Sequence, residues 1–397
     1  MNMISQLLNR AYWAKQRALL TLSPSTINQD VPEVHTGQKT ITGRRIGHVA
    51  MYSDGNAGDT LLPRTVRDAI DGDAANDWQG IHAHRVVNRN LLNEINQLDG
   101  LLIGGGGLFL RDTNPNNLSG WQWSCSVQVL EQIKVPIALF AVGYNRFRGQ
   151  KDFKPAFRRH LELLADKCVY MGLRNSGSIE AIKSYLPESL HPKLRFQPCP
   201  TTICKQLYPE ICTGKPAQPM IALNCAFDRI DLRLGKRKDN ILHQLATAAK
   251  ELSEHATVMY YAHAKGDEQM LPYLDRANVP YQLRRLYYVP PREVVEAYSN
   301  VSLAIGMRGH AQMVPFGCGT PIISLVSHDK VRWFLDDIGQ SDWGVEMTNT
   351  DFKNNLLDSA LNALDTHRII ENQIEQIQVR LLETTCQNAA DFNAAMS

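Results

Sequence analysis

Short apolar runs alternate with longer amphipathic stretches along most of this chain, and this alternation restricts its fold more than any other feature. Parallel strands that are covered by helices on both faces read as continuous apolar runs. The alternation therefore predicts a mainly parallel sheet with crossover helices. The strands expected in the first half of the chain are residues 46–52, 100–103, 137–142, 169–173 and 194–196.

A second series of the same kind follows a hinge-like stretch, residues 207–218, that contains proline and glycine. A chain of 397 residues is too long for one ordinary core, so we expect two Rossmann-like α/β domains that face a cleft. Their expected bounds are 41–210 and 211–345. In the second domain the expected strands are 220–225, 257–262, 301–305 and 321–325, and the expected helices are 240–255, 267–275, 291–299 and 310–317.

Both ends of the chain predict extra helices outside these two domains. Residues 4–20 have the periodicity of a basic amphipathic helix, and residues 21–40 have the composition of a linker. Such a helix either docks on the protein itself, which is the commoner use, or makes a peripheral contact with an anionic membrane. The last segment, 346–397, predicts one or two helices within 351–395 that cross back to the first domain.

Charge and cysteine content exclude several classes of function. Lys and Arg number 42 against 40 Asp and Glu, which gives no basic field of the kind that attracts nucleic acid. No segment is free of charge for long enough to span a bilayer, and the N-terminus lacks the apolar core of a secretory signal. The eight cysteines form no CxxC pair and no zinc-ligand spacing. We expect a cytoplasmic protein without a metal site.

The first candidate site follows the first predicted strand, where Asn56, Gly58 and Asp59 precede a helix that is expected to start near Leu62. Ligands of open parallel sheets bind beyond the carboxyl ends of the strands. Asp59 is a candidate general base there, and Asn56 a candidate for orienting a substrate. The alternative is a plain turn in which Asp59 or Thr60 caps the helix.

Four consecutive glycines at 104–107 follow the second predicted strand. They cost backbone entropy, so close approach of a substrate or of the other domain is expected, above all at Gly105 and Gly106. They do not form the dinucleotide fingerprint, because Pro115 and the polar residues before it leave no room for the required helix.

An aromatic-rich stretch with Trp121 and Trp123 comes next. These side chains either stack on a sugar ring or belong to the core, and the core is the commoner location for tryptophan.

Two arginines and a histidine complete the set of candidates. Arg174, with Ser176 close behind, ends a predicted strand, where a guanidinium can hold a carboxylate or phosphate with two hydrogen bonds. Arg308 and His310 follow another strand and open a helix. The alternatives are a surface salt bridge for Arg174 and a structural role for His310. Together with Asp59, these residues indicate a cleft for a small, multiply charged anion.

The order and spacing of these motifs resemble the polysaccharide pyruvyl transferase family, whose members are similar to glycosyltransferases with two Rossmann-like domains (GT-B-like). The resemblance covers roughly residues 46–340. One departure is Asn175, where many members have aspartate after the arginine. The motifs that carry the resemblance are residues 56–59, the glycines at 104–107, Arg174 with Ser176, residues 308–310, residues 315–325 and residues 329–331, which include Lys330.

The resemblance implies a transferase that moves a pyruvyl group from phosphoenolpyruvate to a saccharide in cell-surface polysaccharide (exopolysaccharide) biosynthesis. Phosphoenolpyruvate is then a donor substrate, and no cofactor or metal is expected. Arg174 and Arg308 would bind its carboxylate and phosphate, His310 would be the general acid, and Asp59 would activate a sugar hydroxyl. Substrate-binding roles are also expected for Asn56, Gly58, Gly105, Gly106, Ser176 and Lys330.

Two other functions stay open at this point. A glycosyltransferase or epimerase with the same architecture would use a nucleotide sugar, but no acidic residue that could hold its ribose follows His310 before Asp329. A non-catalytic sugar-binding relative would tolerate damage to the acid or the arginines, and none is damaged here. The acceptor, whether lipid-linked at the inner face of the membrane or free, and the oligomeric state are not predicted.

Overall fold

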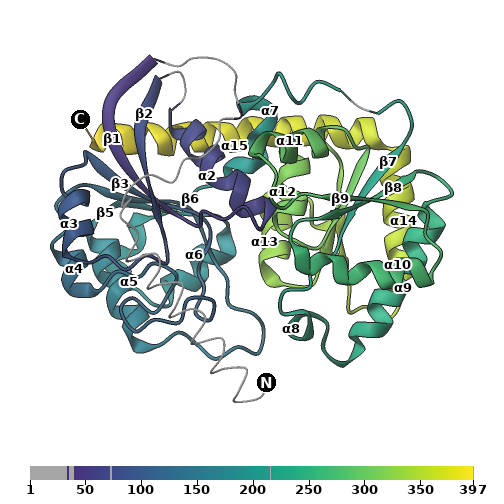
Figure 1. Cartoon of the computed structure of the whole chain (residues 1–397), viewed down its shortest axis with the longest axis horizontal. Helices are drawn as coiled ribbons and strands as arrows, with labels where there is room; N and C mark the ends of the chain where they lie inside the picture. Colours follow the sequence, from purple (N-terminus) through teal and green to yellow (C-terminus); the bar gives the residue numbers. More distant parts are fainter. Residues whose placement is uncertain (1–33, 35–39, 72–73, 215, 397) are drawn as a thin grey trace.

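Two six-stranded sheets lie side by side in the computed structural model, which describes residue 34 and residues 40–71, 74–214 and 216–396 (Figure 1). All of the strand pairs are parallel. Each sheet with its flanking helices forms one Rossmann-like domain, so the predicted α/β class with two such domains is confirmed.

The first domain has the strand order β2-β1-β3-β4-β5-β6. Its central strands β3, β4 and β5 are almost wholly buried, as their apolar runs predict. The strands are β1 (Thr40–Ala50), β2 (Ala74–His82), β3 (Gly100–Phe109), β4 (Ile137–Tyr144), β5 (Cys168–Leu173) and β6 (Leu194–Phe196). The helices are α2 (Ala57–Asp71), α3 (Arg89–Ile95), α4 (Val127–Glu131), α5 (Pro155–Lys167), α6 (Ser176–Lys183) and α7 (Cys204–Leu207), with 3₁₀ turns at Glu188–Lys193 and Pro200–Ile203.

The second domain has the strand order β12-β11-β10-β7-β8-β9. Its strands are β7 (Met220–Asn224), β8 (Thr257–Ala262), β9 (Tyr281–Arg285), β10 (Leu303–Gly306), β11 (Ile322–Val326) and β12 (Gly344–Glu346). Its helices are α8 (Ile230–Leu234), α9 (Lys238–Leu252), α10 (Leu271–Arg276), α11 (Pro291–Ser299), α12 (His310–Gly317), α13 (Asp329–Asp337) and α14 (Phe352–Asp365), with 3₁₀ turns at Gly235–Arg237, Lys265–Met270 and Ser341–Trp343.

Three strands, β2, β9 and β12, are absent from the sequence prediction, and all three lie at sheet edges. An edge strand is covered less completely than a central one, so its sequence does not need a continuous apolar run. β9 accordingly has no fully buried residue, and β12 has one. The prediction therefore recovers the centres of both sheets and misses every edge strand except β6.

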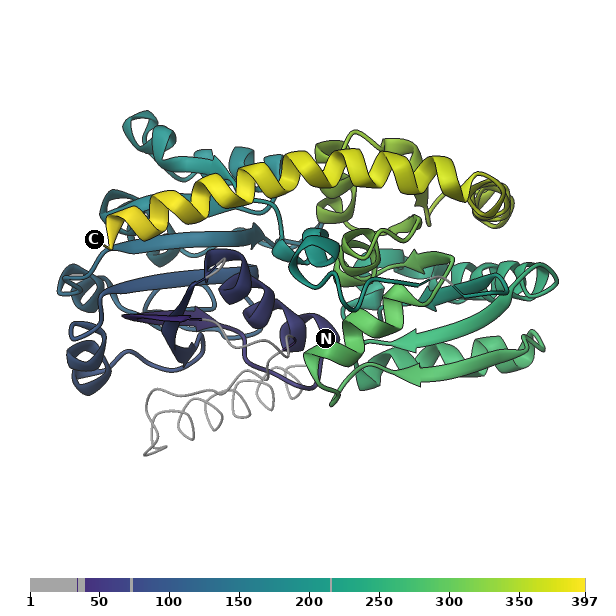
Figure 2. The ribbon, with the colours of Figure 1, turned by 90° about the horizontal axis from the view of Figure 1, so that it is seen from above.

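The last helix, α15 (His367–Ala395), crosses from the second domain to the first, as the sequence predicts (Figure 2). Near its start the side-chain amide of Gln378 donates to the carbonyls of Phe316 at 2.7 Å and Gly317 at 3.0 Å in the second domain. Near its end the Asn388 amide donates to the carbonyl of Phe196 at 3.0 Å in the first domain. The helix before it, α14, packs against α9 and so belongs to the second domain.

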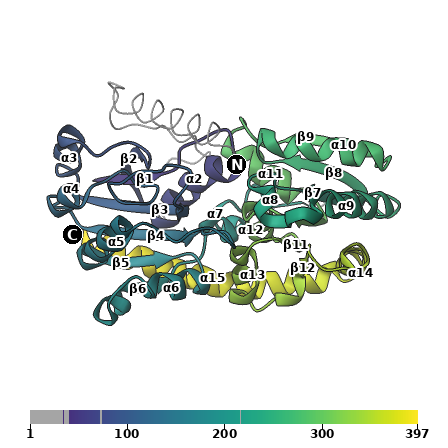
Figure 3. The same ribbon diagram turned by 90° about the horizontal axis from the view of Figure 1, so that it is seen from below.

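A second junction between the domains lies on the face seen in Figure 3, where α6 and α13 contact each other. The backbone N–H of Ser176 donates to the Asp337 carboxylate there, at 3.1 Å.

The predicted helix at 4–20 lies outside the described residues, as does nearly all of the predicted linker. Within the described part of the chain, no helix is both long and apolar enough to cross a membrane.

Candidate active site

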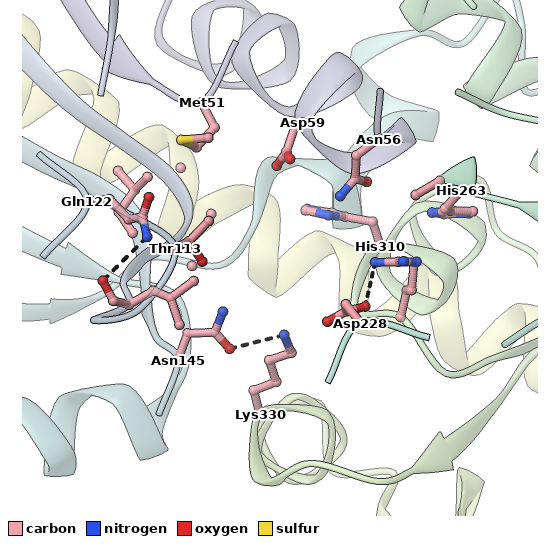
Figure 4. Close-up of a pocket in the computed structure, with 18 of the residues that line it drawn as sticks. Met51, Asn56, Asp59, Thr113, Gln122, Asn145, Asp228, His263, His310 and Lys330 are labelled. Atoms are coloured by element: carbon pink, nitrogen blue, oxygen red, sulfur yellow. Dashed lines mark hydrogen bonds and ion pairs between the residues drawn. The ribbon is translucent and has the colours of Figure 1, made fainter. Parts of the chain in front are cut away.

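A cavity of about 420 Å³ opens between the carboxyl ends of the two sheets (Figure 4). Both domains line it, and most of the residues singled out in the sequence meet there although they lie far apart along the chain. The predicted site residues that line the cavity are Asn56, Asp59, Gly105, Gly106, Arg174, Arg308, His310 and Lys330.

Asn56 and Asp59 are held by the start of α2, which begins at Ala57 and not near Leu62 as the sequence suggests. The Asn56 side-chain oxygen accepts a hydrogen bond from the backbone N–H of Gly58 at 3.0 Å, so Asn56 caps the helix. Asp59 therefore projects from the first turn, and it is not the capping residue.

Burial raises the pKa of Asp59 to about 6, against the opposing effect of Arg308 and Lys330. A carboxyl group with this pKa exchanges its proton near neutral pH, which suits a general base. The electrostatics of the cavity thus agree with the role expected for Asp59.

His310 opens α12 and lies against the first turn of α2. Gly58 leaves room for it, because a Cβ on Gly58 would lie only 2.1 Å from Nδ1 of the imidazole. The other ring nitrogen, Nε2, lies 3.7 Å from Sγ of Cys199. Gly58 itself does not line the cavity, so its contribution is this close approach of two helices.

Burial, together with the smaller effects of Arg174, Lys330 and Arg308, lowers the pKa of His310 to about 3. The imidazole is therefore neutral in the ligand-free protein at neutral pH. A bound anion would offset these three positive charges and raise the pKa of His310. The proton that a general acid needs is thus linked to the arrival of a negatively charged ligand.

Arg174 lies at the end of β5 and is buried, with 7% of its surface exposed. Its Nε has no hydrogen-bond partner, and no carboxylate among the described residues forms an ion pair with it. Gly143 makes room for the guanidinium, since a Cβ there would lie 2.6 Å from Nη2. A buried cation without a counter-charge is costly, and an anionic ligand would remove that cost.

Arg308 is already paired in the ligand-free protein, which the sequence did not indicate. Its guanidinium makes two hydrogen bonds to Asp267, at 2.6 and 2.8 Å, and its Nη1 lies 2.9 Å from the Asp228 carboxylate. Burial alone would lower the pKa of Arg308, but these two carboxylates hold it above its ordinary value. Asp267 and Asp228 were missed, and their position after the carboxyl ends of β8 and β7 was the available signal.

Lys330 at the start of α13 is, after Arg174, the second cation of the cavity wall that forms no ion pair among the described residues. Its ammonium group donates to the side-chain oxygen of Asn145 at 3.1 Å, across the two domains. Gly107 makes room for Asn145, since a Cβ there would lie 2.7 Å from its amide nitrogen. Burial and the nearby Arg233 lower the pKa of Lys330.

One expectation about the glycine run needs correction, and the structure decides between the two alternatives for the tryptophans that follow it. The glycines do not end the strand, because β3 continues through them to Phe109, although Gly105 and Gly106 do line the cavity. Trp121 and Trp123 are fully buried, and the indole N–H of Trp121 donates to His160. Of the two alternatives for these rings, the structure therefore supports the core location and not stacking on a sugar.

Ser176 lies outside the cavity, because it is exposed and its backbone binds Asp337. Its neighbour Asn175, the departure from the family pattern, caps α6 by accepting from the N–H of Ser178 at 2.8 Å. In the described part of the chain, no three His, Cys, Asp or Glu side chains are grouped so that they could hold a metal ion.

The fold and the cavity together define a two-domain α/β protein of the GT-B kind, with His310, Asp59 and two cations without carboxylate partners in its cleft. The model of the family described as polysaccharide pyruvyl transferase matches residues 41–329, which is most of the chain. The chain belongs to this family and is a transferase. A comparison with curated proteins found no significant match.

Solved structures share the fold at low sequence identity. Alr3699/HepE of Anabaena, in complex with UDP, is 10% identical, with a TM-score of 0.54 over 88% of this chain and 99% of that one. A UDP-GlcNAc 2-epimerase of Methanocaldococcus jannaschii is 12% identical, with a TM-score of 0.50 over 80% and 92%. A mutant O-GlcNAc transferase of Thermobaculum terrenum is 11% identical, with a TM-score of 0.50 over 98% and 72%. At this identity the likeness concerns the fold alone.

Proposed function

We propose that this transferase moves a pyruvyl group from phosphoenolpyruvate to a saccharide acceptor and closes a cyclic ketal on two sugar hydroxyls. The observation that carries the proposal is Arg174, a buried guanidinium without a carboxylate partner, beside His310 and Asp59 in one cavity. Phosphoenolpyruvate is a small molecule with a carboxylate and a phosphate, so it offers the negative charge that Arg174 lacks.

In this proposal Arg174 and Lys330 hold the two anionic groups of the donor from opposite domains. Arg308 has a different part from the one expected from the sequence, because Asp267 and Asp228 already balance its charge. It lowers the pKa of His310 and fixes one wall of the cavity. The donor thereby bridges the two domains, and its binding favours the closed cleft.

The reaction needs one proton donor and one proton acceptor. The first sugar hydroxyl attacks C2 of the enol phosphate and loses its proton to Asp59, while C3 gains a proton from His310. The second hydroxyl then attacks C2, the bond from C2 to the phosphate oxygen breaks, and the proton of this hydroxyl leaves with inorganic phosphate. A bound donor raises the pKa of His310 from its low value, so binding of the substrate favours protonation of the general acid.

The acceptor would enter from the first-domain side of the cavity, where Thr113, Gln122 and the backbone at Gly105 and Gly106 offer hydrogen-bonding groups. His84 binds the side-chain oxygen of Gln122, and the amide N–H₂ of Gln122 donates to the carbonyl of Leu110 at 3.4 Å. No cofactor enters this chemistry. Phosphoenolpyruvate as donor places the reaction in the cytoplasm, and a lipid-linked acceptor would bring the protein to the inner face of the membrane.

Calorimetric titration with phosphoenolpyruvate, and separately with UDP, tests the donor. We expect saturable binding of phosphoenolpyruvate that Arg174→Met abolishes. Arg174→Lys should retain part of it, since the charge remains but the planar fork is lost. Binding of UDP without binding of phosphoenolpyruvate would contradict the proposal and favour an enzyme that uses a nucleotide sugar. UDP is the ligand in the Anabaena structure.

A further inference from the structure

One aromatic side chain of the first domain is surrounded by positive charges of the second. Phe147 lies in the loop between β4 and α5 and is buried, with 2% of its surface exposed. The guanidinium carbons of Arg229 and Arg233 each lie 5.0 Å from the centre of its ring, and the Lys330 ammonium lies 5.7 Å from it. The imidazole of His328 packs edge-on at 4.2 Å between ring centres.

The three cations belong to the wall of the cavity, because Arg229, Arg233 and Lys330 all line it. Arg229 precedes α8, Arg233 lies in its last turn and Lys330 lies at the start of α13. Like charges at this spacing repel one another. Asp228 offsets part of the repulsion through its ion pair with Arg233 at 3.0 Å. The electron-rich faces of an aromatic ring attract the cations as well, and they leave the hydrogen-bond donors of the cations free.

Residues before and after Phe147 in the same loop also bind the second domain. Arg148 binds the Asp329 carboxylate, and Asn145 accepts from Lys330. Arg229 reaches the opposite way and donates to Asp112 of the first domain at 2.7 and 3.1 Å. Phe147 can therefore occupy its place among the cations only when the cleft is closed.

We propose that Phe147 is a positioning residue for the anionic donor: its ring holds Lys330, Arg229 and Arg233 together at the cavity once the cleft closes. The inference rests on the proposed function, since it takes the carboxylate or phosphate of phosphoenolpyruvate as the anion that these charges serve. Opening of the cleft removes the ring, the cations separate, and affinity for the anion falls.

Substituting fluorine on the ring tests this directly, because fluorine weakens the attraction between cation and ring with little change of ring volume. Phenylalanine with one, two and three ring fluorines is incorporated at position 147, and phosphoenolpyruvate binding is measured by calorimetry. We expect the dissociation constant to rise with each fluorine, by about 10-fold for the trifluoro ring. Thermal unfolding should stay close to that of the wild-type protein.

Phe153 provides a matched control in the same loop. Its ring stacks on Phe157 at 4.1 Å, and none of the cation–ring contacts found among the described residues involves it. The same fluorinated residues at 153 should leave the dissociation constant within about twofold. A dissociation constant that does not change with the number of fluorines at 147, or that rises equally with fluorines at 153, would overturn the role of Phe147.

Inorganic phosphate separates this inference from the proposed function. If the wild-type protein binds phosphate but ignores phosphoenolpyruvate, the donor assignment fails, and the same series is then read with phosphate. A graded loss of phosphate affinity at 147 still supports the positioning role. A phosphate affinity that does not change with the number of fluorines contradicts it. Phe147→Leu, which removes the ring, should weaken binding at least as much as the trifluoro ring.

Discussion

The imidazole of His310 occupies the space that a side chain on Gly58 would need, with Nδ1 only 2.1 Å from the position of a Cβ there. Two helices from different domains, α2 and α12, therefore meet at a point where one of them has no side chain. This contact sets the position of the proposed acid relative to Asp59, the residue that follows Gly58 in the chain.

Gly58→Ala should abolish most activity without unfolding the protein. Alanine favours the helix by about 1 kcal/mol over glycine, but its methyl group displaces the imidazole. We expect phosphate release from phosphoenolpyruvate, in the presence of a saccharide acceptor, to fall by at least about 100-fold. Gly266→Ala is the control, because Gly266 is also the second residue of a helical turn and its nearest atom would lie 3.8 Å away. Equal activity of both variants would contradict the prediction.

Arg174 and Arg308 should have opposite effects on stability. Arg174→Met removes a buried charge that has no carboxylate partner, so the free energy of unfolding should stay the same or rise by about 1 kcal/mol. Arg308→Met leaves the buried Asp267 charge without its partner and should cost about 3–5 kcal/mol. Urea unfolding of the ligand-free variants measures both. A large loss in Arg174→Met would show that its charge is satisfied within the protein.

Asp59→Asn should stabilise the ligand-free protein above pH 6. The pKa of Asp59 is raised from 3.8 to about 6, so the folded protein holds this proton more tightly than the unfolded chain. Stability therefore falls as the pH rises through this window, and above pH 6 the penalty is complete. Asparagine carries no charge and should recover up to about 3 kcal/mol at pH 7.5 and almost none at pH 4. Asp358→Asn, at an exposed position in α14, is the matched control, and an equal gain in this variant would contradict the role of burial at Asp59.

Phosphoenolpyruvate should bind with uptake of protons. The pKa of His310 is about 3 in the ligand-free protein, and the donor's negative charges raise it, so more protons are taken up as the pH falls from 7.5 to 6. Calorimetry in buffers of different ionisation enthalpy measures this number. His310→Gln should reduce it, and Asp59→Asn should remove the part that belongs to Asp59. A heat of phosphoenolpyruvate binding that does not depend on the buffer would contradict the proposed uptake of protons.

The sequence predicts the centre of this protein better than its edges. Buried strands such as β4 and β10 need apolar residues on both faces, and those runs are visible without a structure. Edge strands such as β9 do not need apolar residues on both faces, so no such run marks them in the sequence. Part of the candidate site is predictable for the same reason. Arg174 and His310 are polar residues that follow buried strands, and this position in the chain is enough to predict them.

What the sequence could not reveal is pairing between distant residues. Nothing local distinguishes Arg308, which binds Asp267 and Asp228, from Arg174, which has no carboxylate partner among the described residues. The same is true of Phe147, whose cations come from more than 80 positions away in the chain. Such properties depend on how the two domains meet, and a pattern of single residues does not contain that information.

The path of α15 has a consequence for the order in which the protein is made. The helix has 29 residues and spans about 43 Å, and it ends beside the first domain, where Met396 packs on Gly100 of β3. During synthesis the first domain leaves the ribosome before α15, the segment that covers it, has been translated. The half of the cleft that carries Arg174 and Asp59 is therefore covered only after α15 has been translated, and a chain truncated before His367 would expose the surfaces of α2 and β5 on which α15 packs.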